Sequence, residues 1–75
     1  MKNKPIHLFS ENNKIKIEKL LISEKNRELY SEFGLIENTK AVILWKSGKK
    51  IILKIGENKL ALSERAAENI LASLI

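Results

Sequence analysis

The sequence predicts a small, mainly β domain, a β-barrel with one inserted α-helix. Short apolar runs bounded by Gly, Asn or Ser recur through most of the chain, as they do in sheets of short strands. One stretch, residues 23–34, instead has helical spacing, a capping serine and a terminal glycine. The length of 75 residues leaves room for one domain, residues 1–75, with a single core.

The chain starts with a polar segment, residues 1–13, in which Leu8 and Phe9 are placed to tuck against the core. We expect this start to be loosely ordered, with residues 1–7 as the part that can be disordered. A turn is expected at residues 11–13, because the two asparagines there tolerate the left-handed conformation.

The first strand is predicted over residues 14–22. Ile15 and Ile17 alternate with charged residues, and the apolar face then resumes at Leu20, after a step of three. A slip of one residue in the alternation is what a β-bulge produces. We therefore predict a bulge in this strand, which helps a small sheet to bend around its core.

The helix is predicted to begin after Ser23, whose hydroxyl can accept a backbone N–H bond at the N-cap. Leu29, Tyr30 and Phe33 follow at helical spacing and form one apolar stripe. Since the chain holds only four aromatic residues, we expect Phe33 to enter the core. Gly34 is the expected left-handed stop, because glycine adopts positive φ without steric cost.

After this stop, Leu35 is expected to fold back on the last helical turn. A turn at Glu37-Asn38 then leads into a series of strands. These strands are predicted over residues 39–46, 49–55 and 59–62, with turns at residues 47–48 and 56–58 between them.

Residues 63–75 allow two predictions. Ser63 can cap a helix, and the apolar residues that follow it have helical spacing to the end of the chain. The alternative is one helical turn to about Asn69 and then a short last strand that closes the barrel, which removes an open sheet edge. Periodicity favours the first prediction, and the exposed edge of a small sheet favours the second.

Composition excludes several classes of protein. With no cysteine there is no disulfide framework and no thiolate metal site. The longest apolar runs are far shorter than the roughly 20 residues that span a bilayer, and no apolar segment follows the basic start. We therefore expect a cytosolic protein.

The net charge of +5 comes mostly from lysine, which makes up twelve of the fourteen basic residues. Arg27 and Arg65 are the only arginines, and arginine is the side chain suited to bidentate phosphate contacts. We therefore expect an ordinary soluble surface and no dedicated nucleic-acid site.

No residue pattern indicates chemistry. His7 is a lone histidine in the starting segment, so a surface position is expected. Glu24, Glu28 and Glu32 form a carboxylate row on one helix face, which we interpret as a solvated face and not as a metal site. Residues 47–50 join two strands and are expected to form a hairpin turn, not a phosphate loop. With no nucleophile and base in a recognisable pattern, we expect no enzyme, no cofactor and no small-molecule substrate.

Tyr30 and Trp45 are the aromatic residues with polar groups. The first expectation is that they pack in or beside the core. The alternative is a groove lined by Tyr30, Leu35 and Trp45 that anchors a peptide.

Several short motifs stand in order along the chain: Arg27-Glu28-Leu29, Gly34-Leu35, Thr39, Leu60-Ala61-Leu62, and Ala67 with Ile70. These motifs and the order of the elements resemble the FeoA family, small SH3-like β-barrels associated with ferrous iron uptake in bacteria. The resemblance covers roughly Leu8 to Ala72. Glu37-Asn38 stands where the family usually has Pro-Gly, and Asn38 can supply the positive φ of that turn. The same barrel is similar to the C-terminal domain of iron-dependent repressors.

The resemblance implies an SH3-like barrel of about five strands, with the short helical turn and final strand at the C-terminus. It also implies a cytosolic accessory protein of ferrous iron transport whose partner is the cytoplasmic GTPase region of a FeoB-like membrane transporter. Binding would tune the GTPase cycle or the assembly of that transporter. We expect the contact surface at the helix and its exit turn, with Arg27, Tyr30, Leu35 and Trp45.

Two other functions stay open from the sequence. One is a basic barrel that binds nucleic acid through lysines of one hairpin, namely Lys40, Lys46, Lys49, Lys50 and Lys54. The other is a repressor-associated barrel that works beside an iron sensor. In any of these roles the apolar end, residues 71–75, invites weak self-association.

Overall fold

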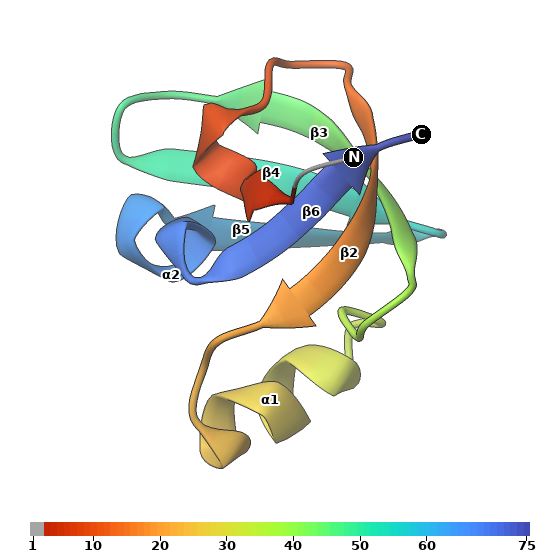
Figure 1. The fold of residues 1–75 in the computed structure, drawn as a ribbon, viewed down its shortest axis with the longest axis vertical. Coiled ribbons are helices and arrows are strands. Elements are labelled where there is room, and N and C mark those ends of the chain that lie inside the picture. Colours follow the sequence, from red (N-terminus) through yellow and green to blue (C-terminus); the bar gives the residue numbers. More distant parts are fainter. Residues whose placement is uncertain (1–2) are drawn as a thin grey trace.

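The computed structural model describes residues 3–75 and shows one antiparallel sheet with short helices around it (Figure 1). Within this part of the chain the strand order is β1-β6-β2-β3-β4-β5. The strands are β1 (Lys4–Pro5), β2 (Lys14–Leu20), β3 (Lys40–Lys46), β4 (Lys50–Ile55), β5 (Asn58–Ser63) and β6 (Ile70–Leu74). The helices are the single 3-10 turn η1 (Ile6–Leu8), α1 (Glu24–Ser31) and α2 (Glu64–Glu68).

The sheet curls around one core, but β1 and β5 remain its two edges. α2 lies between them, since it contacts both η1 and β5. The expectation that the last strand closes the barrel is therefore wrong in one respect. β6 pairs with β1 and β2, and helical turns cover the gap toward β5.

The bulge predicted in the first strand is confirmed. The register of β2 against β6 shifts between Ile17 and Lys19, which re-aims the apolar face toward Leu20. A second shift lies in β3, between Ile43 and Trp45. The sequence did not reveal this second bulge, because both faces of β3 are apolar there.

Positive φ angles mark the expected turns. Gly34 has φ +87 and Gly56 has φ +59, while Asn12 and Asn38 have φ 72 and 73. Asn38 also donates its backbone N–H to the carbonyl of Ile17 at 2.6 Å. Asn38 thus adopts the positive φ angle that glycine adopts at residues 34 and 56.

The C-terminus follows the second of the two predictions. Ser63 caps α2, since its hydroxyl accepts the backbone N–H of Ala66 at 3.2 Å. α2 then ends at Glu68, and β6 begins at Ile70. The apolar residues that have helical spacing in the sequence therefore fall in two elements. Ala67 is buried in α2, and Ile70 is buried in β6.

The start of the chain is more ordered than the sequence predicts. Residues 1–2 of the expected loose segment lie outside the described residues, but Lys4 already pairs with Ala72 of β6. Ile6 of η1 is completely buried. Lys46 holds this segment in place, because its ammonium group donates to the carbonyl of Phe9 at 2.8 Å.

The core is built from isoleucines and leucines of the strands around one phenylalanine, Phe9. Of the two candidates in the first segment, Phe9 is buried and Leu8 is exposed. The expectation that Phe33 enters the core is wrong, since 40% of its surface is exposed. The reason is that α1 does not lie on the sheet.

Candidate functional site

The feature that sets this molecule apart from a plain sheet is α1, which stands off from the strands in Figure 1. This helix contains no buried residue. In most globular proteins a short helix is stable because it buries an apolar face, so α1 needs other supports.

Contacts at its two ends hold α1 in place. At the first end, the Ser23 hydroxyl accepts the N–H of Asn26 at 3.3 Å, and the Arg27 guanidinium donates to the carbonyl of Leu20 at 2.7 Å. At the other end, the N–H of Leu35 donates to the carbonyl of Tyr30 at 3.0 Å. The helix is therefore attached to β2 and to the Gly34 turn, and its length lies outside the core.

Apolar side chains cover much of the surface around α1. Leu29, on α1, is 51% exposed, and Phe33, two residues beyond the end of α1, is 40% exposed. Leu21 and Ile36, which flank the helix in sequence, are each 49% exposed. We call these four residues the α1 apolar surface. Clusters of large exposed apolar side chains commonly mark binding sites.

Two shallow hollows border α1. The larger one has a volume of about 490 Å³ and is lined by residues that include Arg27, Glu28, Ile36 and Asn38. The smaller one, of about 260 Å³, lies on the helix itself beside Leu29. Each hollow thus has one residue of the α1 apolar surface in its lining, Ile36 in the larger and Leu29 in the smaller.

The charge around α1 is opposite to that of the rest of the chain. Residues 21–38 contain four glutamates against Lys25 and Arg27, a net charge of −2. The total is +5, so the remaining residues carry +7. A partner that meets α1 is therefore expected to present an apolar patch with basic residues around it.

The structure separates the residues expected at the contact surface. Arg27 and Tyr30 belong to α1, although Arg27 uses its guanidinium on Leu20 and Tyr30 is half-buried against the core. Leu35 is completely buried, so it is removed from the accessible candidates. It packs inside because the Gly34 turn folds the chain back onto the sheet.

Trp45 lies far from these residues. β3 starts beside the α1 connection and runs away from it, toward the β3–β4 turn at the upper left of Figure 1. Trp45 is five residues beyond Lys40, about 16 Å along an extended strand. The expected groove of Tyr30, Leu35 and Trp45 does not form, because Leu35 is buried. Tyr30 is half-buried against the core as expected, whereas Trp45 is 44% exposed and is not among the residues that pack against the core.

Leu21, Leu29 and Ile36 are accessible residues of the α1 apolar surface that the sequence did not identify as surface residues. Helical periodicity shows only that residues share a face and not whether that face meets the core. The short connection from β2 to α1 was the available signal, because it leaves little chain with which to fold the helix back onto the sheet.

The carboxylate row lies where the sequence predicts it. Glu24, Glu28 and Glu32 are exposed on α1. Among residues 3–75, no three His, Cys, Asp or Glu side chains come close enough to hold a metal ion. His7 is half-buried in η1, and its Nδ1 atom has no hydrogen-bond partner.

The predicted hairpin turn at residues 47–50 is confirmed. The Ser47 hydroxyl accepts the backbone N–H groups of Lys49 and Lys50, each at 3.2 Å. The same amides would be needed to cradle a phosphate group.

Over the described residues, no helix has the length and apolar character needed to cross a bilayer.

Comparisons with known proteins agree on the fold. No protein-family model matches the chain, and no curated protein matches it as a relative. A crystal structure of the iron uptake regulatory protein FeoA superposes with a TM-score of 0.88 at 16% identity, over 99% of this chain and 100% of that one. An NMR structure of a FeoA-like protein from Clostridium acetobutylicum has a TM-score of 0.82 at 21% identity, over 100% and 90% of the two chains.

These superpositions establish the fold. The chain has the mainly β, SH3-like fold of FeoA proteins over its whole length, and the resemblance stated from the sequence is confirmed at that level. Over residues 3–75 the sheet has six strands where about five were predicted, because the two-residue β1 joins it.

Proposed function

We propose that this protein is a non-catalytic, cytoplasmic accessory protein of bacterial ferrous iron transport. It works by docking on the GTPase region of a FeoB-like membrane transporter, and docking tunes the GTPase cycle or the assembly of the transporter. The fold shared with FeoA proteins supports the setting in iron uptake. The α1 apolar surface supports docking as the mode of action.

The observation that carries the docking proposal is the lack of any buried residue in α1 together with four large exposed apolar side chains around it. A helix that stabilised the fold would bury this stripe against the sheet. Instead, Leu29 and Phe33 face outward at a cost that a partner can recover. Covering the exposed half of such a side chain contributes about 1 kcal/mol.

The acidic residues beside this surface add selectivity. Glu32 lines a hollow together with Leu29, and Glu37 lines one together with Ile36. Neither carboxylate has an ion-pair partner among the described residues. Such rim charges mainly steer encounter and reject wrongly charged partners. The proposed docking site on the GTPase region is therefore an apolar patch edged by Lys or Arg, and binding should weaken as salt is raised.

The test is a titration of the isolated GTPase region with this protein, followed by calorimetry. The double variant Leu29→Ser/Phe33→Ser is expected to bind about tenfold to thirtyfold more weakly, because it removes most of the recoverable apolar area. Both residues are exposed, so the fold should be retained, and circular dichroism checks this.

The matched control is Leu8→Ser. Leu8 is 54% exposed but lies on η1, away from α1. The control is expected to bind like the parent protein. If the double variant and the control bind equally well, α1 is not the docking surface. If the parent protein does not bind the GTPase region at all, the proposed partner is wrong.

A further inference from the structure

The outward face of strands β2 to β5 is rich in lysine. Side chains that alternate with the core residues point away from the core, and on these four strands about half of them are lysines. The outward lysines are Lys14, Lys16, Lys40, Lys50, Lys54 and Lys59. We call this surface the lysine face.

The strand register brings like charges together on this face. Lys16 lies directly opposite Lys40, and Lys54 lies directly opposite Lys59. Like charges in directly opposed positions destabilise a sheet. Lys14 and Lys54 also flank Val42 from its two sides, so the lysines form rows across all four strands.

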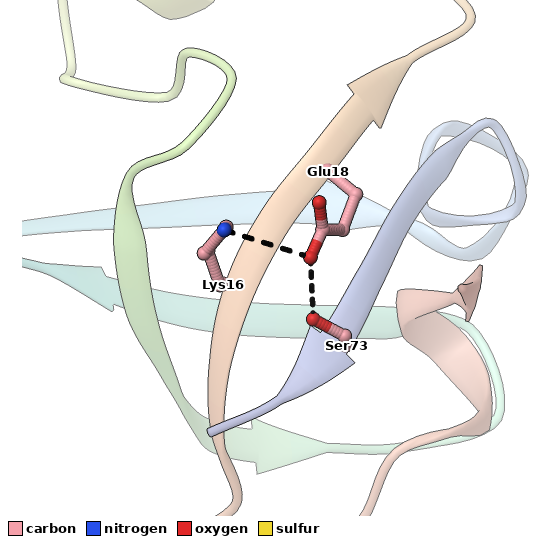
Figure 2. Close-up of polar contacts among 3 residues, drawn as sticks. All are labelled: Lys16, Glu18 and Ser73. Atoms are coloured by element: carbon pink, nitrogen blue, oxygen red, sulfur yellow. Dashed lines mark hydrogen bonds and ion pairs between the residues drawn. The ribbon is translucent and has the colours of Figure 1, made fainter. Parts of the chain in front are cut away.

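The protein itself neutralises little of this charge. Glu18 is the only acidic residue within the four strands. Figure 2 shows it between Lys16 and Ser73: the Ser73 hydroxyl donates to its carboxylate at 2.6 Å, and the ammonium group of Lys16 lies 4.0 Å away. This is the only ion pair found within residues 3–75, so the other lysines of the face have no acidic partner there.

Apolar side chains lie among the lysines. Val42 and Ile52 are half-buried on the outward side, and Trp45 lies opposite Ile52 with 44% of its surface exposed. A tryptophan ring combines a large apolar area with one N–H donor, which is why it is common at the boundary between lipid and water.

We propose that the lysine face binds the surface of anionic lipid bilayers. Lysines supply the attraction to lipid phosphates, each contributing when it comes within a Debye length of the surface. Trp45, Val42 and Ile52 supply shallow apolar contact at the headgroup level. Bound this way, the protein lies on the membrane with its outer sheet surface down.

The shape and chemistry of the face favour a bilayer over a nucleic acid. It is the outer, convex side of a curled sheet, whereas single-stranded nucleic acid is usually held in a groove with several stacking aromatic rings. Trp45 is the only aromatic residue in strands β2 to β5. The two arginines, which would suit bidentate phosphate contacts, lie on α1 and α2.

The inference is independent of the docking partner proposed above, because the α1 apolar surface takes no part in it. The two proposals can fail separately. If both hold, membrane binding keeps the protein at the surface where a transporter is found and leaves α1 free to dock.

The experiment is sedimentation with vesicles of phosphatidylglycerol and phosphatidylcholine in equal amounts, compared with vesicles of phosphatidylcholine alone, at about 0.1 M salt, where the Debye length is about 10 Å. Trp45 is the only tryptophan of the chain, so a blue shift of its emission reports contact with lipid. We expect sedimentation and a blue shift with the anionic vesicles only.

The deciding variant is Lys40→Glu/Lys54→Glu. It is expected to partition at least thirtyfold more weakly, because each lysine lost from an anionic surface weakens binding roughly fivefold and the two new carboxylates add repulsion. Each replaced lysine faces another lysine, so the change relieves repulsion in the sheet, and Lys40→Gln/Lys54→Gln is a milder second variant. The control Lys25→Glu/Arg65→Glu changes the net charge equally on α1 and α2 and is expected to bind like the parent protein.

Three results would overturn the proposal. The first is the absence of sedimentation with anionic vesicles. The second is an equal loss in the Lys40/Lys54 variant and the control, which would make the attraction one of net charge alone. The third is a change in Trp45 emission with a thymidine oligonucleotide at lower phosphate concentration than with vesicles, which would assign the face to single-stranded nucleic acid.

Discussion

Replacing Gly34 with alanine tests how the chain leaves α1 and enters the core. Gly34 has φ +87, where an L-residue costs about 1–2 kcal/mol. An added Cβ would also lie 3.2 Å from Cγ2 of Ile55, a buried side chain that has to shift. Overpacking of this kind costs about 1–3 kcal/mol. We therefore expect Gly34→Ala to lower the free energy of unfolding by about 2–5 kcal/mol.

The measurement is equilibrium unfolding in guanidinium chloride, followed by far-ultraviolet circular dichroism. With a denaturant slope of about 2 kcal/mol/M for a chain of this size, the midpoint should fall by about 1–2.5 M. Such a loss is a large part of the total stability, which for small domains is about 5–15 kcal/mol. Because an unchanged slope shows that only stability has changed, it should be checked in each variant.

Gly56→Ala is the matched control. Gly56 has φ +59, but no atom lies within 4 Å of an added Cβ, so this variant reports the backbone cost alone. It should lose about 1–2 kcal/mol. The difference between the two variants isolates the contact with Ile55. Equal midpoints for Gly34→Ala and Gly56→Ala would refute the reasoning, because the close approach to the core would then cost nothing.

Three further comparisons, each between two variants, test local contributions to stability. Asn38→Ala should lower the free energy of unfolding by about 1 kcal/mol and Asn38→Gly should leave it nearly unchanged, because only glycine keeps φ 73 without strain; equal losses would contradict this. Ser63→Ala should lower the free energy of unfolding by about 1 kcal/mol, because it removes the N-cap of α2. Ser23→Ala should mainly speed amide hydrogen exchange within α1, because that helix has no buried residue and can open without the core. A larger loss of global stability for Ser23→Ala than for Ser63→Ala would show that α1 is part of the core. Ser73→Ala should cost about 1–3 kcal/mol, since it removes a donor to the partly buried Glu18, and Ser73→Thr, which keeps the hydroxyl, should recover part of that loss.

The parts of the fold that depend on local backbone chemistry could be predicted from the sequence. The step of three before Leu20 marks the bulge in β2, because side chains in a strand alternate strictly unless a residue is inserted. Gly34 and Asn38 mark positive φ angles, because glycine and asparagine adopt the left-handed conformation more readily than other residues. The cap at Ser63 was equally visible, although the length of the helix after it was not.

The parts that depend on what covers a surface could not be predicted. The helical stripe that includes Leu29 and Phe33 has the spacing of a core-facing helix. Nothing in the sequence shows that side chains from another segment already fill the core. Phe9 and Ile6 supply that filling from a segment too short to show any periodicity. The strand order also decides that Trp45 and α1 lie at different ends of the molecule.

The lysine face illustrates the same division. The number of lysines is visible in the sequence. Lys40, Lys50 and Lys54 of the face also belong to the basic hairpin that the sequence predicts as one alternative. Lys46 belongs to a different set, because its ammonium group bonds to the carbonyl of Phe9. Lys14 and Lys59 join the face only through the strand register, which connects residues far apart in the chain.

The position of β6 between β1 and β2 has a consequence for how this chain acquires its shape. β1 and β2 are synthesised early, but both pair with β6, which is synthesised near residue 75. In nascent chains that stop short of β6, one edge of β2 therefore has no pairing partner. Pairings between such distant segments slow the search for the native state, typically to milliseconds or seconds. During that interval the unpaired edge is the site at which two unfinished copies would stick together.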